Sequence, residues 1–81
     1  MKIATTSRFD RCFAAASVEK RKAFDKQSKL LLENLRHPSL RAKKYDETKD
    51  LWQARVTGNW RFYFLIEGDT YLLTYIGPHP K

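Results

Sequence analysis

The chain has 81 residues, and its 16 Lys and Arg outnumber its 9 Asp and Glu to give a formal charge of +7. This length supports one small core, so we expect a single domain over residues 1–81. The charge indicates a polyanionic or acidic partner, and it is equally consistent with a basic domain that is merely soluble. No apolar run approaches the ~18 residues of a membrane span. Because there is no signal-peptide pattern and Cys12 is the only cysteine, the sequence predicts a cytoplasmic protein without membrane association.

The first half of the chain predicts a short strand followed by two helices. Residues 2–6 (KIATT) are rich in β-formers, and Ser7 offers an N-cap to an amphipathic helix with apolar residues at positions 9, 12, 13 and 16. Ser17 can cap a second helix that extends to residue 36 or 37, where Pro38 disfavours helix. Two helices this close in sequence form an antiparallel hairpin. The second helix is expected to direct four apolar residues toward the core: Phe24, Leu31, Leu32 and Leu35.

Residues 37–50 (HPSLRAKKYDETKD) form a polar connection in which Leu40 and Tyr45 are the expected anchors. Arg41, Lys43 and Lys44 make a compact basic cluster within it. The cluster is either a solvated loop or, because it directly precedes the next strand, one flank of a binding site.

Residues 51–78 predict three antiparallel strands joined by turns at Gly58-Asn59 and Gly68-Asp69. We expect a three-residue first loop, residues 57–59, with Asn59 in the left-handed conformation. In that register Val56 faces Trp60 and Arg55 faces Arg61, which separates an apolar face from a polar one.

The second hairpin continues the apolar face, and the expected end of pairing at Pro78 delivers the C-terminal residues to the sheet end that carries Arg61. The whole pattern predicts an α+β fold with the order β-α-α-β-β-β, in which a helical hairpin packs on one face of an antiparallel sheet. The expected pairs of the second hairpin are Ile66 with Tyr71, Phe64 with Leu73, Phe62 with Tyr75, and Arg61 beside Ile76.

Two arginines directly opposite each other repel by a few tenths to about 1 kcal/mol. No acidic residue alternates onto their face, so the arrangement favours binding of an anion, and a phosphate suits two planar guanidinium groups best. An exposed face with solvated arginines is the alternative.

The sequence has no paired-carboxylate site, metal-ligand spacing or glycine-rich phosphate loop, so we expect no metal and no cofactor. RNA cleavage needs little more than phosphate binding and proton transfer, because the ribose 2′-hydroxyl is an internal nucleophile. Arg55 and Arg61 can bind the phosphate, and His79 can protonate the leaving oxygen near neutral pH. Tyr63 shares the arginine face and can stack a base, whereas Trp60 is expected in the core.

The run DLWQARVTGNWRFYFLIEGDTYLLTYIGPH and the preceding HPSLRAKKY resemble the RelE/ParE superfamily of type II toxins, and the resemblance covers nearly the whole chain. One branch of that superfamily cleaves mRNA, commonly in the ribosomal A site and without metal, and another poisons DNA gyrase. The RelE-like branch implies that Arg61 binds the scissile phosphate, that Arg55 is a basic position on the preceding strand, and that His79 is a general acid. Further residues are expected to bind RNA: Arg41, Lys43, Lys44, Tyr63 and Lys81.

The chain departs from the family pattern at Gln53, where some members carry a basic residue, and in a C-terminus that stops at Lys81. The leading hypothesis is therefore a toxin that cleaves mRNA as a metal-independent endoribonuclease, dependent on the ribosome, and that inhibits translation. The resemblance also implies an acidic cognate antitoxin as a partner. A gyrase-inhibiting toxin without catalysis and a non-cleaving RNA-binding module are the alternatives.

Overall fold

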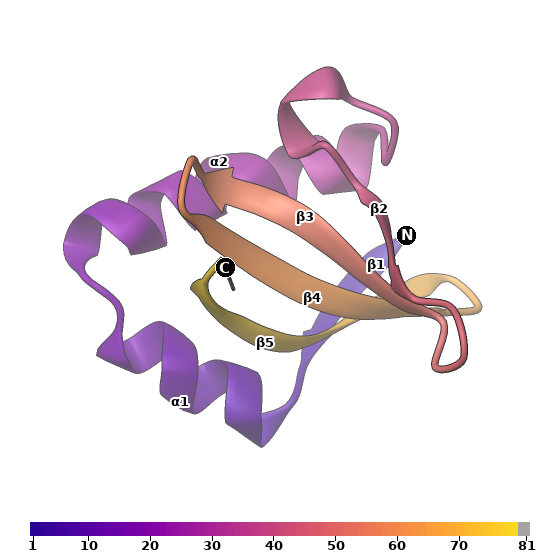
Figure 1. The fold of residues 1–81 in the computed structure, drawn as a ribbon, viewed down its shortest axis with the longest axis horizontal. Helices are drawn as coiled ribbons and strands as arrows, with labels where there is room; N and C mark the ends of the chain where they lie inside the picture. Colours follow the sequence, from indigo (N-terminus) through magenta and orange to yellow (C-terminus); the bar gives the residue numbers. More distant parts are fainter. Residues whose placement is uncertain (80–81) are drawn as a thin grey trace.

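The computed structural model describes residues 1–79 and has two helices that pack on a five-stranded sheet (Figure 1). This α+β arrangement with a helical hairpin confirms the fold expected from the sequence. No helix in the described range is long and apolar enough to cross a membrane. In chain order the elements are β1 (Lys2–Thr5), α1 (Ser7–Ala15), α2 (Val18–Glu33), the 3-10 helix η1 (Pro38–Leu40), β2 (Lys43–Asp46), β3 (Leu51–Thr57), β4 (Trp60–Glu67) and β5 (Thr70–Pro78).

The strands lie in the order β1-β5-β4-β3-β2. The pairs β2–β3, β3–β4 and β4–β5 are antiparallel, whereas β1 pairs with β5 in parallel. The sheet is therefore mixed rather than purely antiparallel. Strand β2 was expected to be part of a polar connection. It is a short edge strand that carries two lysines, a common way to protect an open sheet edge, and its polarity hides it from pattern analysis.

The helix ends differ from expectation where a neighbouring residue caps better. Thr6, not Ser7, caps α1, because Thr6 keeps an extended backbone and its hydroxyl accepts from the amide of Phe9 at 3.1 Å. Ser17 caps α2 as predicted, at 3.3 Å from the amide of Lys20. Helix α2 ends at Glu33, several residues early, because the side chain of Asn34 accepts from the backbone of Arg36 at 2.9 Å and starts a turn.

The core lies between the helices and one face of the sheet. Phe24 of α2 meets Phe62 of β4 edge to face, with ring centroids 5.3 Å apart, and Leu40 anchors η1 in the same core as predicted. Leu32 was expected there but is 45% exposed, since it lies on the outer side of α2. Tyr45 was expected to be an anchor but is 51% exposed. The other sheet face, which no helix covers, is called the open face below.

Three bulges adjust the register of the sheet. In β3, Arg55 pairs with Arg61 as predicted, but Thr57 rather than Val56 pairs with Trp60, so Val56 is an extra residue. The turn then needs only Gly58 and Asn59, and Asn59 is not left-handed. The bulge keeps Val56 in the core without the longer loop that the sequence pattern favours.

The bulge in β5 inserts Thr74. Ile66 pairs with Tyr71 and Phe64 with Leu73 as predicted, but beyond Thr74 the register moves by one residue. As a result Tyr75 leaves the apolar face and pairs with Tyr63 on the open face, while Phe62 pairs with Ile76 and Arg61 pairs with Gly77. The third bulge, in β2, inserts Tyr45 between the pairs Lys44–Trp52 and Asp46–Leu51.

Candidate functional site

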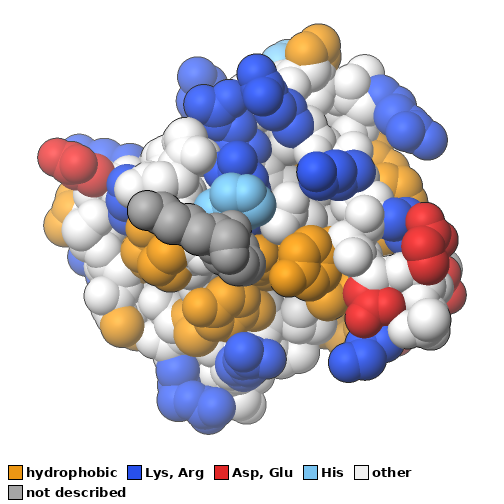
Figure 2. Space-filling view, viewed as in Figure 1, with side chains coloured by type: hydrophobic (Ala, Val, Ile, Leu, Met, Phe, Trp, Pro, Cys, Tyr) orange, Lys and Arg blue, Asp and Glu red, His pale blue; other side chains and the backbone are white. Residues whose placement is uncertain are grey.

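Five polar residues line a hollow of about 150 Å³ on the open face, and we call it the arginine cleft. Its lining comes from five places in the fold: the residue after η1, strands β2, β3 and β4, and the residue after β5. Figure 2 shows the viewer's face of the molecule, on which Lys and Arg side chains surround a histidine and a group of hydrophobic side chains. The lining residues are Arg41, Lys43, Gln53, Arg61 and His79.

Arg61 is the most firmly held cation of the cleft. One of its terminal nitrogens, Nη1, donates to the carbonyl oxygens of Thr57 at 2.7 Å, Trp60 at 2.9 Å and Gly58 at 3.3 Å. The compact turn that follows the β3 bulge brings these carbonyls together. They fix the plane of the guanidinium group, while its Nε and Nη2 atoms make no hydrogen bond within the described residues.

Burial lowers the pKa of the Arg61 guanidinium, and the positive charges of Arg55 and Arg41 lower it further. Arginine nevertheless stays protonated in proteins. Within residues 1–79 the ion pairs are Lys2 with Asp69 and Lys44 with Asp50, so no carboxylate neutralises the cleft. A bound anion would counter the repulsion between the arginines and offset the cost of burying the Arg61 charge.

Arg55 lies opposite Arg61 but outside the lining of the cleft. Its Nη2 atom is directed toward the β3–β4 turn, where a Cβ added to Gly58 would lie 3.7 Å from it. The positive charge of Arg55 still acts on the cleft, because it lowers the pKa of Arg61. The two arginines pair across the strands as predicted, but only Arg61 lines the hollow, and Arg55 flanks it.

Arg41 enters the cleft through an uncommon backbone conformation. It follows η1 with φ 47° and ψ 41°, in the left-handed region, where a side chain other than glycine is uncommon. This conformation ends η1 and turns the chain into β2, where Lys43 pairs with Gln53. Two members of the predicted basic cluster, Arg41 and Lys43, therefore line the same hollow as Arg61.

His79 reaches the cleft because backbone pairing continues past Pro78, which was expected to end it. Pro78 pairs with Trp60, and the amide of His79 donates to the carbonyl of Asn59 at 2.7 Å. Asn59 is itself held by Thr57, whose hydroxyl donates to its side-chain oxygen at 3.0 Å. The predicted approach of His79 to Arg61 is confirmed, while Lys81 lies outside the described residues.

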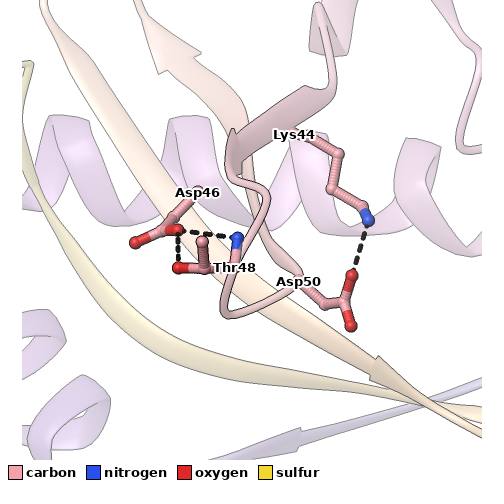
Figure 3. Close-up of polar contacts among 4 residues, drawn as sticks. All are labelled: Lys44, Asp46, Thr48 and Asp50. Carbon is pink, nitrogen blue, oxygen red and sulfur yellow. Dashed lines mark hydrogen bonds and ion pairs between the residues drawn. The ribbon is translucent and has the colours of Figure 1, made fainter.

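Lys44, which was predicted to bind RNA, is directed away from the cleft. Its ammonium nitrogen lies 2.8 Å from Asp50 in the β2–β3 turn (Figure 3). The same nitrogen lies 5.6 Å from the ring centre of Trp52, which stacks on the core residue Phe64. The hydrogen bond to Asp50 raises the pKa of Lys44. In the same turn the hydroxyl of Thr48 donates to Asp46 at 2.7 Å and lowers the pKa of that carboxyl group. These contacts order the β2–β3 turn rather than the cleft.

Gln53 lines one side of the cleft, and Tyr63 packs behind it. Tyr63 is only 5% exposed, so its ring offers little open surface for the stacking that the sequence suggested. Its hydroxyl oxygen lies 3.1 Å from Nε2 of Gln53, which is 3% exposed and lines the cleft. Gln53 is the site residue that sequence analysis recorded only as a departure from a family pattern.

Gln27 joins α2 to the strand that carries Arg55. It is 4% exposed, and its Nε2 atom donates to the carbonyl of Arg55 at 2.8 Å and to that of Ser39 at 3.1 Å. We expect Gln27→Leu to lower the free energy of unfolding by about 1–3 kcal/mol, because two backbone carbonyls lose their partner. Urea denaturation measures the loss. The matched change Lys26→Leu, at an exposed position, should stay within about 0.5 kcal/mol of the parent, and equal losses would contradict the assignment.

The cleft provides charge and one imidazole. Among residues 1–79 no group of three His, Cys, Asp or Glu side chains is placed to hold a metal ion. The arrangement can bind a phosphate group, stabilise added negative charge on it and donate a proton from His79.

No family model and no curated protein matches the sequence.

The structure does match solved structures of other proteins. A YoeB/ParE toxin from Agrobacterium tumefaciens has a TM-score of 0.82 at 12% identity, over 99% of this chain and 100% of that one. The fold is that of the RelE/ParE toxins. An archaeal RelE from Pyrococcus horikoshii, solved in complex with RelB, has a TM-score of 0.78 at 14% identity, over 99% of this chain and 96% of that one. YafQ from E. coli has a TM-score of 0.76 at 18% identity, over 94% and 90%.

Proposed function

We propose that this chain is the toxin of a type II toxin-antitoxin system and cleaves mRNA as a metal-independent endoribonuclease. The observation that carries the proposal is the arginine cleft, where Arg61, held by three carbonyls, lies with Arg41, Lys43 and His79 in one hollow free of carboxylates. The RelE/ParE fold and the resemblance of the sequence to the RelE-like branch support the same activity.

In the proposed reaction the scissile phosphate of RNA binds Arg61, and Arg41 and Arg55 add to the positive potential. The ribose 2′-hydroxyl loses its proton to water and forms a bond to phosphorus. The bond from phosphorus to the 5′ oxygen breaks, and His79 donates a proton to that oxygen. The guanidinium group stabilises the charge that develops on the phosphate oxygens. The products are a 2′,3′-cyclic phosphate and a 5′-hydroxyl.

We propose that the ribosome assists this reaction. The described residues of the cleft offer few groups that could orient the 2′-hydroxyl, and a ribosome that holds mRNA in a fixed conformation would provide that order. The cleavage of free RNA would then be slow, and the cleavage of translated mRNA fast.

The proposed protein partner is an acidic antitoxin. The chain has a formal charge of +7, and the two ion pairs of residues 1–79 leave most of its Lys and Arg without an acidic partner. The RelE structures from Methanococcus jannaschii and Pyrococcus horikoshii are complexes with RelB. An antitoxin that covers the arginine cleft would exclude RNA, and its association would weaken as salt increases.

A translating extract with mapped mRNA ends tests the proposal. We expect new ends that carry 2′,3′-cyclic phosphate or 3′-phosphate, and we expect slow cleavage of free RNA, at high protein concentration, to persist in EDTA. A gyrase supercoiling assay runs beside it. Intact mRNA together with blocked supercoiling would favour the gyrase-inhibiting alternative, and RNA binding without cleavage would favour a binding module.

A further inference from the structure

A second hollow lies beside the arginine cleft on the open face, and we call it the tyrosine pocket. It measures about 220 Å³, below the ~300 Å³ at which pockets for drug-sized ligands begin. It therefore suits one small planar group rather than a large ligand. The lining residues are Arg8, Tyr45, Leu51, Tyr63, Thr74 and Tyr75.

Four of the six residues that line the tyrosine pocket have planar side-chain groups. The ring of Tyr63 meets that of Tyr45 at 5.0 Å, edge to face, and that of Tyr75 at 5.7 Å. The guanidinium carbon of Arg8 lies 4.6 Å from the ring centre of Tyr75. Tyr63 is buried between its neighbours, whereas Tyr45 is 51% exposed and Tyr75 is half-buried. Tyr45, Tyr75 and Arg8 are thus the groups that can contact a ligand.

Two features of β5 create this pocket. The extra residue Thr74 turns Tyr75 to the open face, and the Thr74 hydroxyl donates to the carbonyl of Tyr63 at 3.3 Å. The ring of Tyr75 then lies over Gly77, where an added Cβ would come within 2.8 Å of the ring carbon Cζ. Bulges commonly redirect a side chain beside a functional site. The same bulge brings Gly77 opposite Arg61, so it shapes the pocket and the cleft together.

The pocket and the cleft share one wall. Tyr63 lines the pocket, Gln53 lines the cleft, and their side chains are 3.1 Å apart. Tyr63 and Arg61 are two residues apart on β4, about 7 Å along the strand. A single nucleotide can extend over this span from its phosphate to its base.

We propose that the tyrosine pocket binds one nucleobase of the RNA, next to the phosphate that the arginine cleft holds; this inference rests on the proposed function. The base stacks on Tyr45, the most exposed of the three tyrosine rings. The guanidinium group of Arg8, which already covers the ring of Tyr75, adds a cationic planar contact beside the base. Stacking on tyrosine tolerates every base, so the pocket adds affinity and position and only a weak sequence preference. The positive charge of Arg8 favours a nucleotide over an apolar side chain of a protein partner.

Short RNAs with 2-aminopurine at successive positions test the proposal, and where cleavage has been mapped the positions are chosen around that site. A 2′-deoxy sugar before the scissile phosphate prevents cleavage, and stacking quenches the probe. We expect quenching at one position next to that phosphate. Tyr45→Ala and Arg8→Ala should remove the quenching and weaken binding roughly 10-fold. Arg11→Ala, an exposed arginine one turn along α1, is the matched control and should behave as the parent. Gly77→Ala should reduce the quenching too, because it displaces the Tyr75 ring.

The outcomes separate the pocket from the proposed function. If the parent protein cleaves mRNA but quenches the probe at no position, the pocket does not bind a base and the nuclease proposal stands. If the probe is quenched in the pocket but mRNA stays intact, the nuclease proposal fails and the base site stands. A loss of antitoxin binding in Tyr45→Ala and Arg8→Ala, with RNA binding unchanged, would assign the pocket to the protein partner and overturn the inference.

Discussion

Arg61→Ala is expected to lower the rate of RNA cleavage by about 10²–10³ and to abolish growth arrest, because the cleft loses its one fixed phosphate ligand. The fold should survive. The three carbonyls that Nη1 now contacts belong to the β3–β4 turn, where Gly58 and Asn59 are exposed and water can replace the guanidinium group. Single-turnover cleavage of a mapped RNA measures the effect, and far-UV circular dichroism verifies the fold.

Two further variants make the Arg61 result specific. Arg61→Lys keeps the charge but loses the planar fork, so a lysine cannot contact the turn carbonyls and the phosphate in the same way, and we expect it to recover only a small part of the activity. Arg11→Ala removes one positive charge at an exposed position of α1 and should leave cleavage unchanged. Full growth arrest by a folded Arg61→Ala protein would remove the phosphate role.

The parts of the fold that follow regular periodicity could be predicted from the sequence. The alternation around Arg55 and Arg61 placed both on the open face, and the turn at Gly68 has the left-handed backbone, φ 59°, that the glycine permits. The hydrophobic spacing in α1 and α2 located the helical hairpin. These predictions were right because apolar residues occupy the buried face of each element. Positions on that face recur every 2 residues in a strand and every 3.6 residues in a helix.

The rest of the site depends on breaks in that periodicity. Each bulge adds one residue to one strand, and alternation read from the sequence assumes that none is added. The Thr74 bulge moved Tyr75 to the open face and created a pocket that sequence analysis missed. The only sequence signal for this bulge is a break in the alternation. Two residues, Thr74 and Tyr75, lie between the buried Leu73 and Ile76, where strict alternation would place one.

The placement of the cations in the cleft also depended on structure that periodicity does not encode. Arg41 and Lys44 are three residues apart in one basic cluster, yet the left-handed conformation of Arg41 directs it into the cleft, while the alternation of β2 directs Lys44 toward Asp50. Gln53 is buried beside Tyr63 and completes the wall between two hollows. Its position opposite Tyr63 follows from the predicted register, in which Arg55 faces Arg61, but its burial and its hydrogen bond to Tyr63 are seen only in the structure.

His79→Gln is expected to slow cleavage by about 10²–10⁴, the usual contribution of a general acid, without weakening RNA binding. The glutamine can still contact the substrate but cannot donate a proton to the leaving oxygen. The backbone amide of residue 79 donates to the carbonyl of Asn59 at 2.7 Å, and this bond remains when the side chain changes. Residue 79 therefore stays beside Arg61 in the parent and in His79→Gln, and a loss of rate reports on the imidazole itself.

The pH dependence of cleavage distinguishes proton donation by His79 from simple contact. As a general acid, His79 should give the parent protein a pH-dependent single-turnover rate. His79→Gln should lose that dependence. His37→Gln is the matched control, since His37 caps η1 through its contact with the amide of Ser39 at 3.1 Å and does not line the cleft. An unchanged single-turnover rate for His79→Gln would exclude His79 as the acid, and the leaving oxygen would then take its proton from water while Arg61 and Lys43 stabilise the charge.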